Sequence, residues 1–233
     1  MHYFPLSLPF VVILVFLFLF LIGFVEVGIL SYAYQRMGIG RRHRFSLLFF
    51  SLFGSYLNIP LFELPPEQVM TNSYVDFYGI RHMIPLVREW PATIVAVNLG
   101  GAVIPLFLSV YLTLKNKIHA PALLGVAVVS FIVHLMAYPV RGVGIAVPIF
   151  IPPISATIVG ILLSRRYAPA LAYISGSMGT LIGADILNLG KIRGLGAPVA
   201  SIGGAGTFDG IFLTGILAVL IASFIVGTND KSA

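Results

Sequence analysis

The sequence predicts an all-α membrane protein, a bundle of about seven transmembrane helices with broken or re-entrant segments. Apolar residues make up 58% of the 233 residues and charged residues only 9%, whereas a soluble domain carries roughly 25% charged residues. The mean hydropathy is +1.01, so polar side chains are too few to cover a water-soluble surface. The apolar residues also occur in runs near the roughly 20 residues that a helix needs to cross a bilayer. We therefore treat residues 1–233 as a single integral membrane domain.

The apolar runs place the spans in order along the chain. The first run is too long for the apolar part of a cleaved signal peptide, and neither Lys nor Arg precedes it, so we interpret it as a retained span. The longest polar stretch, about residues 63–90, is expected to form an outer loop. The expected spans are 8–34, 45–62, 91–114, 119–138, 148–164, 168–189 and 208–227.

Lys and Arg occur more often in one set of connecting loops than in the other. Nine lie on one side and five on the other, and cytoplasmic loops carry the excess of positive charge. We therefore expect a multi-pass protein of the cell membrane with its N-terminus outside and its C-terminus inside. The inside set is Arg36, Arg41, Arg42, Arg44, Lys115, Lys117, Arg165, Arg166 and Lys231, and the outside set is Arg81, Arg88, Arg141, Lys191 and Arg193.

Several classes of function lack their sequence motifs in this chain. The absence of cysteine excludes disulfides, thiolate nucleophiles and cysteine-based metal sites. No His-Glu-x-x-His, Gly-x-Ser-x-Gly or Walker A motif is present, so we expect no metal and no cofactor. The positive charges form short clusters between apolar runs and no basic domain, which argues against a nucleic-acid partner. Composition indicates membrane lipid as a partner and leaves the oligomeric state open.

Glycine, proline and asparagine interrupt several of the expected spans. The interruptions lie at residues 58–60, 98–101, 139–144 and 201–206. Proline removes a backbone donor and glycine weakens a helix, and within a bilayer irregular backbone is tolerated only where protein buries it or where it lines a wet cavity. We therefore expect these segments to converge on a packed interior with a cavity, although glycine also serves simple close packing of helices.

Only three acidic residues lie inside the expected spans: Glu26, Asp185 and Asp209. A charge near the centre of a bilayer costs roughly 3 kcal/mol or more, so such residues are functional candidates. Asp185 lies late in the sixth span and Asp209 at the start of the seventh, and consecutive spans are usually neighbours. We expect the two aspartates at a similar depth near the outer end of both helices. For Glu26 we expect a helix–helix or interfacial contact.

The aspartate pair favours intramembrane proteolysis of a transmembrane peptide substrate. Two carboxylates close together in a low dielectric share one proton, so one acts as a base toward water while the other stabilises the oxyanion. Gly206 and Gly210 would let the backbone of an extended peptide approach. Asp185 and Asp209 are the candidate catalytic residues. The expected substrate-binding or cavity residues are Gly204, Gly206, Thr207, Gly210, Asn58, Asn98, Asn188 and Arg141.

The same residues support two other interpretations, which the sequence leaves open. Oxygen atoms of the two aspartates, of Asn58, Asn98 and Thr207, and of carbonyl groups freed at broken helices could bind a cation or relay protons in a transporter or channel. Either aspartate could instead form a structural ion pair with a nearby cation. The candidates for such a pair are Arg141, Lys191 and Arg193.

Two stretches carry a resemblance to a known family. They are Gly179-Thr-Leu-Ile-Gly-Ala-Asp-Ile-Leu-Asn-Leu and Ser201-Ile-Gly-Gly-Ala-Gly-Thr-Phe-Asp-Gly. With weaker stretches over about residues 45–222, they resemble a prokaryotic membrane family known as domain of unknown function 1614. This resemblance implies membership of a family and no activity.

A looser resemblance connects the aspartates with presenilin, signal peptide peptidase and prepilin peptidase. Those enzymes carry one Asp on each of two consecutive membrane helices, the second within Gly-x-Gly-Asp. Here Gly204-Ala-Gly is followed by Thr-Phe before Asp209, so two residues intervene, and Ala184 precedes Asp185 where presenilins have Tyr. The resemblance implies an aspartyl peptidase that cuts within the membrane.

Overall fold

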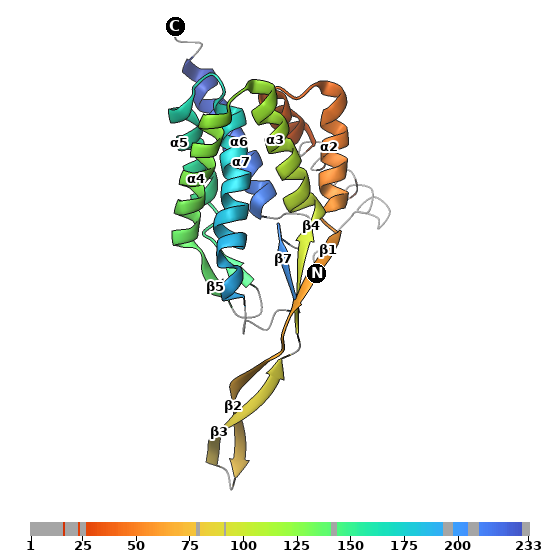
Figure 1. The fold of residues 1–233 in the computed structure, drawn as a ribbon, viewed down its shortest axis with the longest axis vertical. Helices are drawn as coiled ribbons and strands as arrows, with labels where there is room; N and C mark the ends of the chain where they lie inside the picture. The colour runs from red at the N-terminus through yellow and green to blue at the C-terminus, as the bar shows by residue number, and fades with distance from the viewer. Residues whose placement is uncertain are drawn as a thin grey trace, which may run out of the picture.

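The helices form a bundle, and the β-strands lie toward one end of it (Figure 1). A computed structural model describes residues 16, 23, 27–77, 80–90, 92–140, 144–192, 198–204 and 210–229. Residues 27–36 are helical. The α-helices that follow are α2 (Arg41–Gly54), α3 (Ile104–Asn116), α4 (His119–Met136), α5 (Ile151–Leu163), α6 (Ala168–Thr180) and α7 (Gly210–Asn229). Two π-helical turns, η1 (Leu99–Val103) and η2 (Leu181–Asp185), and a 3-10 helix, η3 (Ile186–Lys191), extend α3 and α6.

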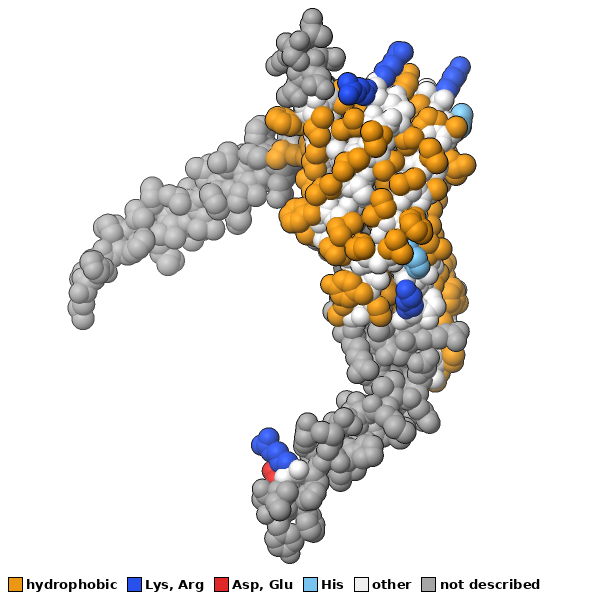
Figure 2. All heavy atoms as spheres, turned by 90° about the vertical axis from the view of Figure 1, so that its left-hand side faces the viewer, with side chains coloured by type: hydrophobic (Ala, Val, Ile, Leu, Met, Phe, Trp, Pro, Cys, Tyr) orange, Lys and Arg blue, Asp and Glu red, His pale blue; other side chains and the backbone are white. Residues whose placement is uncertain are grey.

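Four of the described helical segments have the length of membrane spans, and the surface of the bundle is apolar. Large apolar side chains face outward, among them Phe107, Leu123 and Leu162, which are 69, 74 and 78% exposed. Figure 2 shows such side chains covering the helical part of the face in view, a surface that suits lipid and not water. The predicted all-α membrane bundle is therefore confirmed. Four segments are long and apolar enough to span, Leu99–Asn116, His119–Met136, Ala168–Lys191 and Gly210–Gly227, while α5 is apolar but shorter.

The α6 helix is the buried centre of the bundle. It packs against α3, α4, α5 and α7, and all of its residues are buried. Small residues at these contacts let the neighbouring backbones approach closely. A Cβ added at Gly160 of α5 would lie 2.8 Å from the Ala172 nitrogen, and one added at Gly179 would lie 2.6 Å from a side-chain carbon of Val129. Larger side chains at these positions would force the helices apart.

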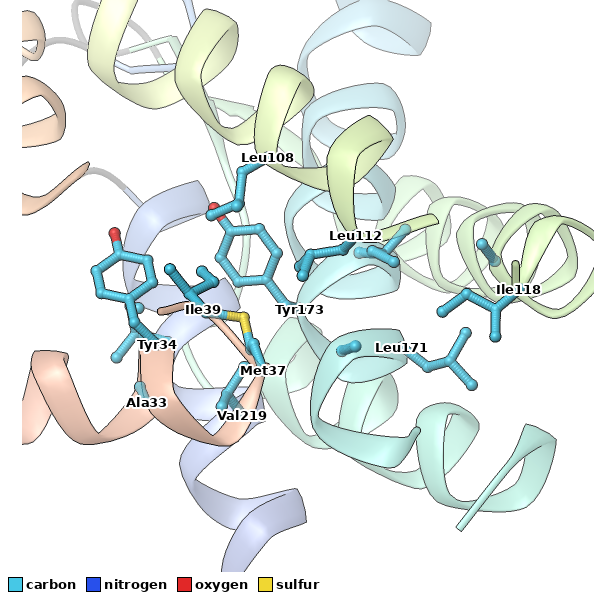
Figure 3. Close-up of a cluster of buried hydrophobic side chains, with 14 residues drawn as sticks. Ala33, Tyr34, Met37, Ile39, Leu108, Leu112, Ile118, Leu171, Tyr173 and Val219 are labelled. Atoms are coloured by element: carbon cyan, nitrogen blue, oxygen red, sulfur yellow. The ribbon is translucent and has the colours of Figure 1, made fainter. Parts of the chain in front are cut away.

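A cluster of buried apolar side chains joins the helix at residues 27–36 to α3, α6 and α7 (Figure 3). Tyr34 and Tyr173 are each 1% exposed, and Leu112 and Val219 are fully buried beside them. Fully burying an apolar side chain of this size contributes roughly 1.5–3 kcal/mol. The cluster therefore fixes the N-terminal described helix to the rest of the bundle.

Two expected spans, 45–62 and 91–114, are shorter helices joined to strands. The strands are β1 (Asn58–Leu64), β2 (Glu67–Phe77), β3 (Ile80–Trp90), β4 (Thr93–Asn98), β5 (Tyr138–Val140), β6 (Gly144–Ala146) and β7 (Val199–Ile202). In the order β1-β4-β7, β1 is antiparallel and β7 is parallel to β4. Short apolar runs suit a strand as well as a helix, and β4 is rich in β-branched residues. Composition alone therefore did not predict this sheet.

The expected outer loop at 63–90 contains a long β-hairpin. Strands β2 and β3 pair antiparallel from Glu67 opposite Trp90 to Phe77 opposite Ile80. Near the tip, Arg81 Nε lies 3.9 Å from Asp76 Oδ2 in an exposed ion pair. Figure 1 shows the hairpin extending away from the helices, so this segment adds nothing to the packed interior of the bundle.

Of the nine Lys and Arg residues of the expected inside loops, eight lie at the end of the bundle opposite the hairpin, and Lys231 lies outside the described residues. Arg36 Nη2 donates to the Ser223 carbonyl of α7 at 3.3 Å, and Lys115 Nζ donates to the Gly38 carbonyl at 2.6 Å. These bonds bring three helices together at the end of the bundle where α7 ends (Figure 1). We name this the cationic end; its residues are Arg36, Arg41, Arg42, Arg44, Lys115, Lys117, Arg165 and Arg166.

We predict that Gly100→Ala destabilises the protein. An added Cβ would overlap the Ser51 carbonyl oxygen and the Ser55 nitrogen at the end of α2, and overpacking of this kind costs roughly 1–3 kcal/mol or more. The control is Gly190→Ala, where an added Cβ meets no atom within 4 Å. Thermal unfolding in detergent measures both variants, and equal melting temperatures would contradict the close contact between α2 and η1.

Candidate functional site

Asp185 is the last residue of the π-helical turn η2 and is bonded to the turn after β7. Its Oδ2 accepts a hydrogen bond from the Gly203 N–H at 2.8 Å. Gly203 and Gly204 have φ angles of +92° and +79°, a region that glycine adopts at little cost. An added Cβ at Gly203 would also lie 2.6 Å from the Ala102 nitrogen of η1. Glycine is therefore needed at position 203 for both conformation and space.

A cavity of about 400 Å³ lies beside Asp185, within the size range of small-ligand sites. Parts of β6, α5, η2, η3, β7 and α7 form its wall, and Thr180, Ser201 and Thr214 add hydroxyl groups to the carboxylate. Thr180 is 5% exposed and its Oγ1 has no hydrogen-bond partner among the described residues. The wall therefore contains a carboxylate and a buried hydroxyl with unused hydrogen-bonding capacity.

Strand β7 presents its edge to this cavity. Among the described strands it is the outer strand of its sheet, paired with β4 alone. All four of its residues, Val199–Ile202, line the cavity. Because successive side chains of a strand point to opposite faces, contact with all four indicates that the cavity borders the edge of the strand. An edge strand has backbone groups that no second strand pairs, and of those in β7 the Ser201 carbonyl already accepts from the Gly204 N–H at 3.2 Å.

The Asn98 side chain connects the sheet to the helices next to it through hydrogen bonds. It is 1% exposed, and its Nδ2 donates to the Ser55 carbonyl at 2.7 Å and to Asn58 Oδ1 at 3.1 Å. Its Oδ1 accepts from the Gly101 N–H at 2.8 Å, capping η1. The Ser201 hydroxyl lies within donating distance of two acceptors, Asn58 Oδ1 at 2.7 Å and the Gly204 carbonyl at 2.5 Å. One network of side chains thus connects the end of α2, β1, β4, η1 and β7.

Asn188 lies on the other side of η2, where the π-helical turn passes into η3. Its Nδ2 donates to the carbonyls of Gly183 and Ala184 at 2.8 and 3.0 Å, and it lies 3.2 Å from His134 Nδ1 of α4. Asn188 is fully buried, so it satisfies carbonyl groups that the change of helix type leaves free. This arrangement makes His134 a packing partner of η3.

The structure brings some of the sequence-predicted site residues together. Asp185, Gly204 and Gly210 line one cavity, and Asn58 and Asn98 support β7 from behind it. Asn188 contacts α4 and does not line this cavity. Asp185 forms no ion pair with Lys191, the described member of the three cations considered. Outside the described residues lie Glu26, Arg141, Arg193, Gly206, Thr207 and Asp209.

Sequence reasoning did not single out Thr180, Ser201 or Gly203 as site residues. Thr180 lies five residues before Asp185, a spacing that puts the two side chains about 140° apart on a regular α-helix, so helical periodicity does not predict that both line one cavity. The π-helical turn η2, which ends at Asp185, changes this angle. The roles of Ser201 and Gly203 depend on the β7 strand and the turn after it. Their hydrogen bonds reach across the fold, so no local pattern reveals them.

We predict that Asn98→Ala destabilises the fold more than the same substitution at Asn116. The variant leaves the Ser55 carbonyl and the Gly101 N–H without partners, and a buried group left unpaired costs roughly 1–3 kcal/mol. Asn116→Ala is the control, because Asn116 makes one local bond, to the Leu112 carbonyl. Unfolding in detergent should show a markedly lower midpoint for Asn98→Ala; equal midpoints would contradict the role of the network.

Comparison with known proteins identifies a family. Residues 52–221 match a family described as "Protein of unknown function (DUF1614)". The match includes the sheet strands, α3 to α6 and most of α7, and thus both walls of the cavity beside Asp185. No curated protein and no solved structure matches the chain. Because the match covers most of its length, the chain belongs to the family of proteins of unknown function DUF1614.

Proposed function

We propose that the protein is an intramembrane aspartyl peptidase that uses Asp185 and Asp209 to hydrolyse peptide bonds of membrane substrates. The observation that carries this proposal is that one cavity contains the Asp185 carboxylate and the edge of strand β7. Gly210, which follows Asp209 in the chain, lines the same cavity. A peptidase needs an acid–base group and a surface that holds the substrate backbone, and this cavity combines the two.

The edge of β7 is the part of the cavity that would bind the substrate backbone. In a transmembrane helix each peptide carbonyl is engaged in a backbone hydrogen bond and shielded by side chains, so a substrate must be extended before water can attack it. An extended peptide adds to an exposed sheet edge through main-chain hydrogen bonds. A substrate segment paired with Val199–Ile202 would pass Gly204, which lines the cavity beside Asp185 and has no side chain to obstruct it.

The chemistry requires both aspartates and one shared proton. The ionised carboxylate takes a proton from water as the water oxygen bonds to the peptide carbonyl carbon, and the protonated carboxyl donates to the developing oxyanion. When the C–N bond breaks, a proton passes to the leaving nitrogen, which gives a free carboxyl and a free amine. The Gly203 N–H orients the Asp185 carboxylate through its hydrogen bond to Oδ2.

The charge distribution supports a position and orientation in the cell membrane. The cationic end carries the Lys and Arg residues of one set of loops, and positively charged loops remain in the cytoplasm. With this end inside, the C-terminus lies inside and the hairpin outside. The cavity beside Asp185 then lies in the outer half of the bundle, since η2 and η3 end away from the cationic end.

We predict that Asp185→Asn and Asp209→Asn each abolish cleavage of a single-span peptide reporter in proteoliposomes. Loss of an acid–base group lowers a rate by roughly 10²–10⁴-fold, while in Asp185→Asn the new amide oxygen can still accept from Gly203 and preserve the turn. Asp76→Asn is the control, because Asp76 lies in the exposed ion pair near the hairpin tip. Cleavage that persists in both Asp185→Asn and Asp209→Asn would exclude this pair as the catalyst.

A specific contact also favours a second candidate, an ion- or proton-coupled transporter or channel. Gly203 touches both interrupted helices, through Ala102 of η1 and through Asp185 of η2. Transporters place their coupling sites where broken helices meet. Flux of protons or Na⁺ into liposomes that contain the wild type, absent with Asp185→Asn and without any peptide cleavage, would favour this candidate over the peptidase.

A further inference from the structure

A second hollow, separate from the cavity beside Asp185, runs between α2 and α3. We name it the α2–α3 groove. It has a volume of about 720 Å³, and its wall is almost entirely apolar. One stripe of α2 and one stripe of α3 face each other across it. The lining residues are Ile39, His43, Ser46, Leu47, Phe50, Phe53, Gly54, Leu57, Leu99, Val103, Ile104, Phe107, Leu108 and Tyr111.

Contacts at its two ends define the groove. At the strand end, α2 touches η1 so closely that a Cβ added at Gly54 would lie 3.0 Å from the Gly100 nitrogen. At the cationic end, Lys115 of α3 contacts the turn before α2, where its Nζ donates to the Gly38 carbonyl at 2.6 Å. From His43 to Gly54 the groove follows eleven helical steps, about 16 Å. That length matches one leaflet of a hydrocarbon core about 30 Å thick.

Among the described residues, the Lys and Arg near the groove lie at its cationic end. Lys115 Nζ lies 5.4 Å from the ring centre of Tyr111, a lining residue. Arg44 Nε donates to the carbonyl of Ile39, another lining residue, at 2.9 Å. Arg41 and Arg42 come before Arg44 in the first turn of α2. The sequence has no acidic residue between positions 27 and 62 or between 90 and 184, so no nearby carboxylate neutralises these cations from within those segments.

We propose that the α2–α3 groove binds one anionic phospholipid, with an acyl chain between the two helices and the phosphate on Arg41, Arg42, Arg44 and Lys115. The apolar wall and the leaflet-long groove match the chain, and the cations match the headgroup. A second copy of this protein is a poorer occupant, because the same face would bring two acid-free cationic ends together. This inference does not depend on the peptidase proposal.

The test uses the full chain, freed of lipid in detergent, and native mass spectrometry with phosphatidylglycerol or phosphatidylcholine of identical acyl chains. Wild-type protein should retain one phosphatidylglycerol molecule in preference to phosphatidylcholine. Arg41→Gln with Arg42→Gln should weaken phosphatidylglycerol binding by about 25-fold, roughly fivefold for each surface cation. The matched control, Arg165→Gln with Arg166→Gln, removes the same charge at the same end, just after α5, which lies on the other side of the bundle from α2 (Figure 1), and should leave the affinity unchanged.

Two further variants locate the lipid in the groove. Ser46→Trp places a large side chain in the groove and removes no side-chain hydrogen bond seen in the structure. It should abolish the preference for phosphatidylglycerol over phosphatidylcholine. Because the chain lacks cysteine, a fluorophore on Ser46→Cys reports on the groove and one on Leu162→Cys on the exposed face of α5. Phosphatidylglycerol with brominated chains should quench the first label saturably and before the second.

Some results would overturn the proposal. Equal affinity for the two lipids, equal loss in the two arginine pairs, or unchanged binding in Ser46→Trp would each exclude an anionic lipid at this position. Quenching at Ser46→Cys that fails to exceed quenching at Leu162→Cys would do the same. A label at position 46 that is shielded without added lipid would instead assign the groove to a second copy or to residues 1–26 of the same chain.

Discussion

The fold depends on how the protein satisfies backbone groups at places where apolar segments stop being helical. Within a bilayer no water is present to pair with a free N–H or carbonyl. Asn98 solves this problem at one point, since its amide pairs with the Ser55 carbonyl at the end of α2 and with the Gly101 N–H at the start of η1. Without such a side chain, α2 could not end so close to β1, and η1 could not begin directly after β4.

The candidate site is built on this network. Asn58 accepts hydrogen bonds from both Asn98 and Ser201. The position of β7 is therefore set by these hydrogen bonds and not by apolar packing alone. The turn after β7 then reaches η1 through Gly203 and binds Asp185 through the Gly203 N–H. On the opposite side, α6 holds η2 in place because its small residues pack against every neighbouring helix. The cavity therefore lies between a hydrogen-bonded turn and a closely packed helix.

The sequence predicted the helical bundle well and the sheet not at all. Long apolar runs identify α4, α6 and α7, because in lipid the composition of a helix is set by the solvent around it. A strand of four to seven apolar residues has no comparable signal, so β1, β4 and β7 were assigned to helices or loops. Asn58 and Asn98 were recognised as interruptions, but their contact depends on the β1–β4 register. Asn188 was expected in the cavity and instead satisfies carbonyls beside His134.

The parallel pairing of β4 with β7 has a consequence for how the chain is made. Ile94 pairs with Val199, and α3, α4, α5 and α6 all lie between them in the chain. A ribosome therefore delivers β4 to the membrane about a hundred residues before its partner exists. During that interval one edge of β4 has no strand beside it, an arrangement that lipid tolerates poorly. The sheet can close only late in synthesis, so the order of translation leaves β4 dependent on temporary cover by neighbouring protein.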